Sequence, residues 1–301
     1  MSRTLLLVDG SALIHRAYHA MPTSMTNKSG QPTGAVYGFV KMLMRAVADI
    51  QPTHIVIALD RPEPTFRKGL YIGYQANRPP ADDSLKTQYS LVRDLIQAMD
   101  IPLVDKAGYE ADDVIGTIAH QVVQNSSDDQ VLIITGDKDL MQLVNTQVNL
   151  VLPKKGMAEV KKVDTAGVQQ KLHIRPDQVV DYKGLIGDSS DNYPGVHGIG
   201  PKTAAKLLAQ FDSYPAIYQH LDDIDEKVRT KLINGQDGGD ISYQLARIRT
   251  DLDVTFDWDH AKGIIRNPAK LAAVLSDYGF SSIVRQFDLE HATPDEQMSL
   301  F

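Results

Sequence analysis

Short apolar runs alternate with helical patterns over the first half of the chain. Three runs are almost continuously apolar and a fourth is interrupted by Asn149: Leu5–Val8, Ile55–Leu59, Val131–Thr135 and Val148–Leu152. Such runs are typical of strands that are buried on both faces of a sheet. Helical patterns lie between them, at Ala35–Asp49, Leu85–Met99 and Glu110–Gln124. This alternation predicts an α/β fold with a mostly parallel central sheet flanked by helices.

Two regions depart from this alternation of strands and helices. Residues 61–83 contain four prolines and several basic residues, and they are too long and polar for a simple connection. From about Asp177 the pattern becomes helical, with glycine and proline punctuation at Tyr193–Pro201. We therefore expect an α/β core over residues 1–176 with an excursion at about 61–85, a helical lobe over 177–290 and a tail over 291–301.

Acidic residues follow three of the predicted strands. Asp9 follows the first strand, Asp60 the second, and Asp137 and Asp139 the third. Ligands of open α/β sheets bind beyond the carboxyl ends of the strands, so these acids should meet at one edge. The start of a predicted helix and the start of the helical lobe add further acids. The candidate metal ligands are Asp9, Asp60, Glu110, Asp112, Asp113, Asp137, Asp139, Asp188 and Asp191.

So many carboxylates cannot share one site unless something offsets their repulsion. Mg²⁺ and Mn²⁺ prefer oxygen ligands, and two such ions about 3.5–4 Å apart can hold a phosphodiester for in-line attack by water. The alternative is that each acid acts locally, as a helix cap or by favouring a helix dipole. That alternative explains single acids better than it explains the whole set.

The composition excludes some classes of protein and of metal site. The chain has no cysteine, which excludes disulfides and thiolate metal sites and is compatible with the cytoplasm. The N-terminal apolar run is too short for a signal peptide or a membrane helix, so we expect a soluble, cytoplasmic protein. The formal net charge of −7 argues weakly against a nucleic-acid partner. Without the nine candidate ligands, however, acids and bases nearly balance.

Several ordered motifs resemble those of bacterial 5′-nucleases of the flap-endonuclease kind, including the 5′-nuclease domain of bacterial DNA polymerase I. The similarity spans nearly the whole chain, from about Leu5 to Phe287. Its motifs are Leu7–Ser11, Phe66-Arg67, Asn77–Pro80, Glu110–Asp113, Thr135–Asp139, Gly187–Asn192 and Pro194–Thr203. The resemblance implies a PIN-like 5′-nuclease fold with a helix–three-turn–helix DNA-binding lobe. It also implies a monomer that acts on branched, nicked or 5′-flap DNA and on RNA-primed DNA.

The same resemblance implies two metal ions, Mg²⁺ or Mn²⁺, in one acidic site. Asp113 would lie at the border of the coordination sphere. The ligands around one ion would be Asp9, Asp60, Glu110 and Asp112, and those around the other Asp137, Asp139, Asp188 and Asp191. The implied reaction is hydrolysis of phosphodiester bonds near junctions of single- and double-stranded DNA. Its product ends would be a 3′-hydroxyl and a 5′-phosphate, and its purpose the removal of primers and flaps in replication and repair.

A glycine-rich turn in the lobe predicts a second contact with DNA. Gly198 and Gly200 let backbone N–H groups approach a phosphate at a helix N-terminus. Lys202 and Lys206 lie one helical turn apart. The alternative is a plain corner between two helices. The resemblance implies a grip on duplex DNA that ignores sequence and often uses a monovalent cation such as K⁺. The expected contacts are Gly195, Gly198, Gly200, Lys202, Thr203 and Lys206.

The excursion corresponds, by the same resemblance, to the start of the helical arch through which a 5′ strand passes. Arg67, Lys68 and Arg78 supply positive charge there, and Tyr71 and Tyr74 could stack on unpaired bases. The alternative is a solvated basic loop.

Two residues depart from the family pattern. Gln75 stands where the family has a lysine that contacts the scissile phosphate, and His15 stands where it has an aromatic residue that stacks on a base. Lys68 lies seven residues before Gln75, about two turns away if this stretch is helical. We therefore expect Lys68 to substitute in part for the missing charge, with Arg78 beside it. One alternative function is a branched-DNA-binding protein whose catalysis is impaired by Gln75. For His15 the alternative is a local role on a helix face. A PIN-type ribonuclease fits less well, because such domains have fewer acids and lack the glycine-rich lobe.

The chain ends in Gln297, Met298, Ser299, Leu300 and Phe301. This segment resembles the short motif by which bacterial replication proteins bind the sliding clamp. The apolar side chains could enter a pocket while the glutamine forms a hydrogen bond at its rim. The alternative is simple packing onto the core. The same ending leads us to expect a stand-alone nuclease.

Overall fold

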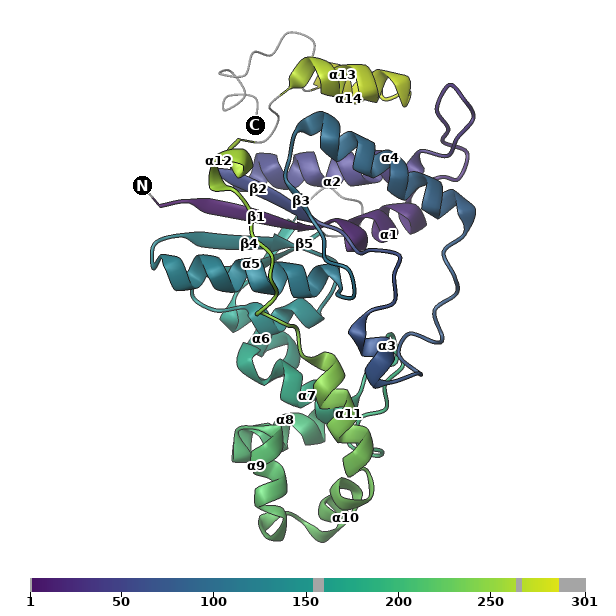
Figure 1. The fold of residues 1–301 in the computed structure, drawn as a ribbon. Helices are drawn as coiled ribbons and strands as arrows, with labels where there is room; N and C mark the ends of the chain where they lie inside the picture. Colours follow the sequence, from purple (N-terminus) through teal and green to yellow (C-terminus); the bar gives the residue numbers. More distant parts are fainter. Residues whose placement is uncertain (1, 154–159, 264–266, 287–301) are drawn as a thin grey trace.

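The computed structural model describes residues 2–153, 160–263 and 267–286 of the chain (Figure 1). In this part of the chain, six strands form one sheet in the order β3-β2-β1-β4-β5-β6. All neighbours pair in parallel except β6, which is antiparallel to β5. The mostly parallel sheet is therefore confirmed. The strands are β1 (Thr4–Asp9), β2 (His54–Ala58), β3 (Leu103–Val104), β4 (Gln130–Ile134), β5 (Val148–Pro153) and β6 (Val160–Val163).

Successive side chains of β1 point to opposite faces of the sheet. Leu5 and Leu7 belong to one apolar cluster together with α5 (Ala111–Asn125). Leu6 and Val8 belong to the other, which the helices of the opposite face complete. These helices are α1 (Gly10–Ala20), α2 (Gly34–Ile50) and α4 (Asp83–Met99). Figure 1 shows α5 below the sheet and α2 and α4 above it.

The four predicted strands correspond to β1, β2, β4 and β5, and the three predicted helices to α2, α4 and α5. The sequence did not indicate β3, β6 or α1. Helix α1 begins directly after β1, with no loop between them. Gly10 makes this junction possible, because a Cβ atom there would lie 2.6 Å from Leu59 Cδ2 and 3.0 Å from the Ala58 carbonyl oxygen.

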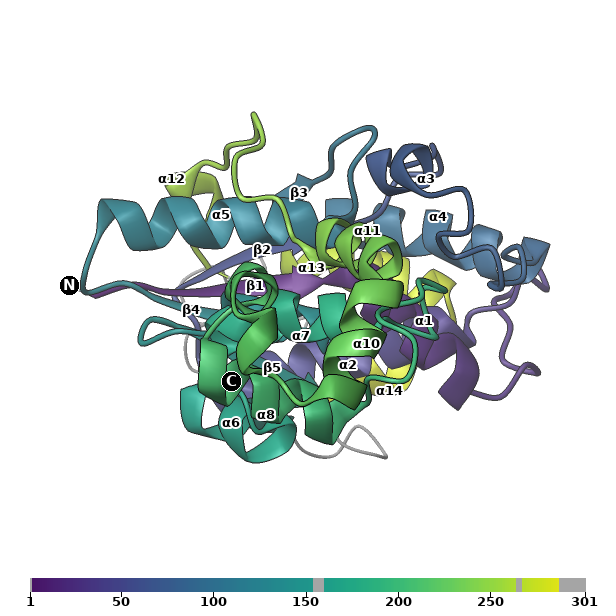
Figure 2. The same ribbon diagram turned by 90° about the horizontal axis from the view of Figure 1, so that it is seen from below.

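A helical lobe lies below the core in Figure 1 and faces the viewer in Figure 2. Between the core and the lobe the chain forms η1 (Asp139–Leu143), α6 (Thr165–Leu172) and η2 (Pro176–Gln178). The lobe consists of α7 (Val179–Ile186), α8 (Pro201–Phe211), α9 (Tyr214–Gln219), η3 (Leu221–Asp223), α10 (Glu226–Asn234) and α11 (Gln236–Ala246).

The expected lobe, residues 177–290, is too long. After α11 the chain returns to the core, where α12 (Trp258–Ala261) contacts β2. Two further helices, α13 (Pro268–Asp277) and α14 (Ser281–Gln286), follow. Leu271, Leu275 and Ile283 share an apolar cluster with α2 and α4. A helical pattern shows which face of a helix is apolar but does not show against which element that face packs. This explains why the predicted lobe was too long. The expected tail, 291–301, lies outside the described residues.

The excursion is mostly irregular. It contains one short helix, α3 (Phe66–Leu70), followed by turns up to the start of α4. Figure 1 places α3 near α11, between the core and the lobe. No helix in the described ranges is long and apolar enough to cross a membrane.

Candidate active site

Three neighbouring parallel strands bring acids to one edge of the sheet. Asp9 is the last residue of β1 and also the N-cap of α1, where its carboxylate accepts a hydrogen bond from the Ala12 amide at 2.9 Å. The Thr135 hydroxyl, just beyond β4, donates to Asp9 at 2.6 Å. Burial, together with the charges of Asp60 and Asp137, raises the pKa of Asp9 to about 7.

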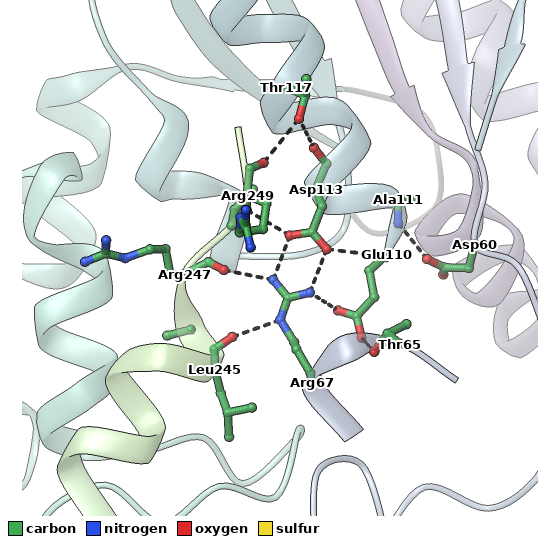
Figure 3. Close-up of polar contacts among 12 residues, drawn as sticks. Asp60, Thr65, Arg67, Glu110, Ala111, Asp113, Thr117, Leu245, Arg247 and Arg249 are labelled. Carbon is green, nitrogen blue, oxygen red and sulfur yellow. Dashed lines mark hydrogen bonds and ion pairs between the residues drawn. The ribbon is translucent and has the colours of Figure 1, made fainter. Parts of the chain in front are cut away.

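The first turn of α5 brings a second group of acids to this edge. Asp60, two residues beyond β2, accepts a hydrogen bond from the Ala111 amide at 2.8 Å (Figure 3). Burial raises the pKa of Asp112, and the nearby charges of Asp137 and Asp9 raise it further. The pKa of Glu110 is raised to about 7 by burial, against the opposing charge of Arg67. These carboxylates are thus costly to ionise together.

One cavity of about 1030 Å³ collects most of the candidate ligands. Its acidic lining residues include Asp9, Asp60, Glu110, Asp112, Asp137, Asp139 and Asp191. Residues of the excursion line the same cavity, among them Lys68, Gln75 and Arg78, and so does His15. Asp113 and Asp188 are not among its lining residues. Seven of the nine acids named from the sequence thus line one cavity at the carboxyl edge of the sheet.

Two basic side chains lie among these acids. Lys183 of α7 places its Nζ atom 2.6 Å from Asp139 and also forms an ion pair with Asp188. Arg78 forms an ion pair with Asp191. In the described ranges, no three histidine or acidic side chains already converge closely enough to hold an ion. The Lys183 ammonium thus lies between two carboxylates, and the Arg78 guanidinium pairs with one.

Arg67 and Asp113 form a buried pair, which corrects two expectations (Figure 3). Arg67 is 3% exposed and Asp113 is fully buried. Two parallel bonds of 2.7 and 2.8 Å join the guanidinium to the carboxylate. The amides of Glu110 and Arg249 donate to the same carboxylate. Arg67 is therefore inaccessible to DNA, and Asp113 has no free oxygen for a metal ion.

Tyr74 is buried as well, so it cannot stack on an unpaired base as expected. Its ring is 3% exposed and stacks on Tyr193, with 6.4 Å between the ring centroids. Its hydroxyl lies 3.1 Å from Glu110 and 3.4 Å from Asp191. Tyr71 is only partly buried, and its ring lies against Gly73.

Gln75 lies at the edge of the acidic cavity. Its backbone amide donates to the Asp191 carbonyl at 2.8 Å, and its side-chain amide donates to the Asp191 carboxylate at 3.3 Å. Lys68 is exposed and lines the cavity, but the chain between these residues is not a continuous helix. The helical spacing that we assumed between Lys68 and Gln75 is therefore wrong. His15 is exposed on α1, with its ring edge-on to Tyr89 at 5.9 Å.

The glycine-rich turn opens helix α8, as expected. Gly195 and Gly198 have φ angles of +63° and +82°, a region that favours glycine. A Cβ atom on Gly195 would lie 2.2 Å from the Gly187 nitrogen, whereas one on Gly200 would meet nothing within 4 Å. The backbone at Gly200 is thus open to a ligand. Lys202 and Lys206 are exposed on the first two turns of α8, and Thr203 between them is partly exposed.

The chain matches two family models along most of its length. Residues 4–173 match "5′-3′ exonuclease, N-terminal resolvase-like domain", and residues 174–269 match "5′-3′ exonuclease, C-terminal SAM fold". The chain belongs to the 5′-3′ exonuclease family.

Curated relatives agree with this family. DNA polymerase I of Bacillus subtilis is 36% identical over 301 residues, which cover 99% of this chain and 34% of the relative. The thermostable DNA polymerase I of Thermus aquaticus is 36% identical over 285 residues, or 95% of this chain and 33% of the relative. The chain thus spans about a third of the length of these relatives.

Solved structures show the same fold. A flap endonuclease of bacteriophage T5, in a complex with DNA and metal ions, superimposes with a TM-score of 0.65 and 18% identity, covering 96% of this chain and 98% of that one. The catalytic core of Rad2 in complex with DNA substrate gives a TM-score of 0.61 and 17% identity, covering 100% and 93%. These likenesses confirm the PIN-like core with its helical lobe.

Three residues beside the candidate sites were missed from the sequence. Lys183 lies five positions before Asp188, and no motif marked it. Lys231 of α10 donates to the Gly198 carbonyl at 3.1 Å. Ser242 of α11 accepts from the Gly195 amide at 2.8 Å and donates to the Gly238 carbonyl at 2.7 Å. All three depend on tertiary contacts that local patterns do not encode. The candidate clamp motif, residues 297–301, lies outside the described residues.

The raised pKa of Asp9 predicts a pH dependence of stability without metal. The folded state keeps its proton up to about pH 7, whereas the ordinary pKa is 3.8. Between these values the unfolded state ionises first, so this group's contribution to stability falls as the pH rises. Asp9→Asn removes the titration. In EDTA, the variant should therefore gain stability relative to the wild type as the pH rises from about 4 to about 7, as measured by urea unfolding. A constant difference across that range would contradict the pKa shift.

Proposed function

We propose that the chain is a structure-specific 5′-nuclease, a 5′-3′ exonuclease and flap endonuclease that depends on divalent metal. The observation that carries this proposal is the cavity at the carboxyl edge of the sheet, which seven of the nine candidate carboxylates line together with residues of the excursion and of the helical lobe. The substrate would be branched, nicked or 5′-flap DNA, including RNA-primed DNA. Its hydrolysis would remove primers and flaps during replication and repair.

The donor set fits hard divalent cations. All candidate ligands are carboxylates, which Mg²⁺ and Mn²⁺ prefer. Burial and mutual repulsion raise the pKa of several of them, and bound cations would relieve that repulsion. Two ions would be held by Asp9, Asp60, Glu110, Asp112, Asp137, Asp139, Asp188 and Asp191. When bound, they would supply an activated water and offset the charge on the leaving oxygen.

Several side chains would hold the substrate. Arg78 and Lys68 line the acidic cavity and would bind the phosphate near the scissile bond. The exposed His15 would stack on a neighbouring base. In the lobe, the amides at Gly198 and Gly200, with Lys202, Thr203 and Lys206, would bind the duplex backbone, and K⁺ would support that turn. Such binding should weaken steeply with salt.

Relatives support this assignment. The T5 flap endonuclease binds DNA and metal ions, and the Rad2 core binds a DNA substrate. A DNA substrate favours a cytoplasmic location, and the family resemblance favours a monomer. The alternative function is branched-DNA binding without efficient cleavage, and it rests on one observation. The side chain of Gln75 contacts Asp191 and supplies no positive charge at this edge of the cavity.

Cleavage should depend on a divalent metal and on the acids that line the cavity. With a 5′-labelled flap duplex, the wild type should release the flap in Mg²⁺ or Mn²⁺ but not in EDTA. Asp137→Ala/Asp139→Ala should still bind the duplex but should not release the flap, because both acids line the cavity. Gel separation of the labelled product measures this. Tight binding without cleavage in either metal would favour the binding-protein alternative.

Gln75→Lys should raise the rate. The new ammonium would lie near Asp191 at the cavity edge and could stabilise charge on the scissile phosphate. One positioned donor at comparable sites is worth about 10²–10³ in rate, so an increase of about tenfold or more in single-turnover cleavage is expected. Gln75→Met is the matched control, since it adds no charge and should not accelerate cleavage. An unchanged rate for Gln75→Lys would show that another cation already fills this role.

We also propose that residues 297–301 bind the bacterial sliding clamp. Deleting Gln297–Phe301 should lower the affinity for the clamp by about tenfold or more, because a few apolar anchors carry most of the energy in such contacts. Surface plasmon resonance measures this. Replacing residues 293–296 with glycine and serine should leave the affinity unchanged. Equal affinity of the deletion variant and the wild type would reject the proposal.

A further inference from the structure

Three donors surround the carboxylate of Glu110, and all come from residues 65–74 at the start of the arch. The Thr65 hydroxyl donates to one carboxylate oxygen at 3.2 Å. Arg67 Nη1 and the Tyr74 hydroxyl donate to the other, at 3.2 and 3.1 Å. A carboxylate offers about four acceptor positions, so these bonds orient Glu110 and still leave room for a cation. Figure 3 shows Thr65 and Arg67 on either side of Glu110.

The Thr65 side chain bonds to Glu110 and does not cap its own helix. It is the N-cap residue of α3, yet its side chain makes no capping hydrogen bond. A threonine at an N-cap normally accepts a hydrogen bond from an amide of the first turn, which stabilises the helix. Here its hydroxyl is directed to Glu110 instead. The backbone supports this arrangement, because the Phe66 amide donates to the Gly108 carbonyl at 2.9 Å.

Arg67 connects Glu110 to two further parts of the molecule. Besides Glu110 and Asp113, it donates to the carbonyls of Leu245 and Arg247, both at 2.9 Å. These carbonyls belong to the segment in which the chain leaves α11 of the helical lobe. One buried guanidinium therefore joins the start of the arch, the first turn of α5 and the lobe (Figure 3).

Asp113 makes this junction compatible with a metal site. Its carboxylate forms both parallel bonds to the guanidinium, so the charge of Arg67 is already balanced. Arg67 can then orient Glu110 through a single hydrogen bond without neutralising it. Removing Asp113 would leave a buried cation to compete with any metal ion for Glu110.

We propose that Arg67, with Thr65, is a positioning residue that sets the affinity of the acidic site for divalent cations by orienting Glu110. This inference rests on the proposed metal site. By the reciprocity of linked equilibria, cation binding should in turn order residues 65–74 and hold the lobe segment 245–247 against α5. The start of the arch is thus part of the metal site before any DNA arrives.

The test uses Mn²⁺ and the full chain without DNA. Electron paramagnetic resonance measures free Mn²⁺ during titration and gives the affinity. Thr65→Val keeps the side-chain shape and removes one hydrogen-bond donor. Arg67→Lys keeps the positive charge but loses the planar set of N–H donors of the guanidinium. Partners of metal ligands commonly contribute about 10–100-fold to affinity, so each variant should bind Mn²⁺ at least about tenfold more weakly. Urea unfolding checks that the fold persists, and Thr65→Val keeps the test valid if Arg67→Lys is unstable.

A matched control and a double-variant cycle separate positioning from general damage. Thr230→Val makes the same exchange on α10 of the lobe, where the threonine hydroxyl donates to the Glu226 carbonyl at 2.8 Å, and it should leave Mn²⁺ affinity unchanged. In a Glu110→Gln background, Thr65→Val should have no further effect if it acts through Glu110.

The outcomes are distinct. Weaker binding by Thr65→Val, lost in the Glu110→Gln background, supports the inference. Wild-type affinity in Thr65→Val, or an undiminished effect in the Glu110→Gln background, overturns the inference and leaves the proposed nuclease intact. Absence of Mn²⁺ binding by the folded wild type would reject the metal site and this inference together.

Discussion

Repulsion among carboxylates at one edge of a parallel sheet is the constraint on which the rest of this structure depends. Parallel pairing of β2, β1 and β4 brings their carboxyl ends together, and α5 adds its own acids. Without compensation, these groups take up protons, as the raised pKa of Asp9 and Glu110 shows. The surrounding elements can be understood as ways of holding such charges close together until cations neutralise them.

Compensation comes from outside the sheet. Lys183 from the lobe pairs with Asp139, and Arg78 from the excursion pairs with Asp191. Arg67 is different, because Asp113 already balances its charge. The lobe is therefore tied electrostatically to the core through Lys183, and the excursion is tied to the lobe through Arg78. Neither could be displaced without exposing unpaired acids, which links the shape of the molecule to the ionisation of its centre.

The sequence predicted what depends on local pattern. Apolar runs located four strands, and the acids that follow them located the edge where they meet. Burial could not be read in the same way. Arg67 and Tyr74 look like surface residues of a basic loop, yet tertiary contacts bury both. The sequence also did not show where α13 packs, because its apolar face could pack equally well on the core or on the lobe. Spacing along the chain also misled us for Lys68 and Gln75, since turns interrupt the helix that would have related them.

The contact between Gly187 and Gly195 has a geometric consequence. The two backbones touch so closely that neither residue can carry a side chain, and Asp188 and Tyr193 exchange two backbone hydrogen bonds of 2.9 Å between them. The loop with Asp188 and Asp191 and the turn that opens α8 are thus one rigid piece. In a nuclease, such a rigid piece would fix the distance between two contacts on the substrate. A duplex phosphate bound at the turn would lie at a fixed distance from the carboxylates, so the position of the cut would be set by the double helix and not by the free end of the strand.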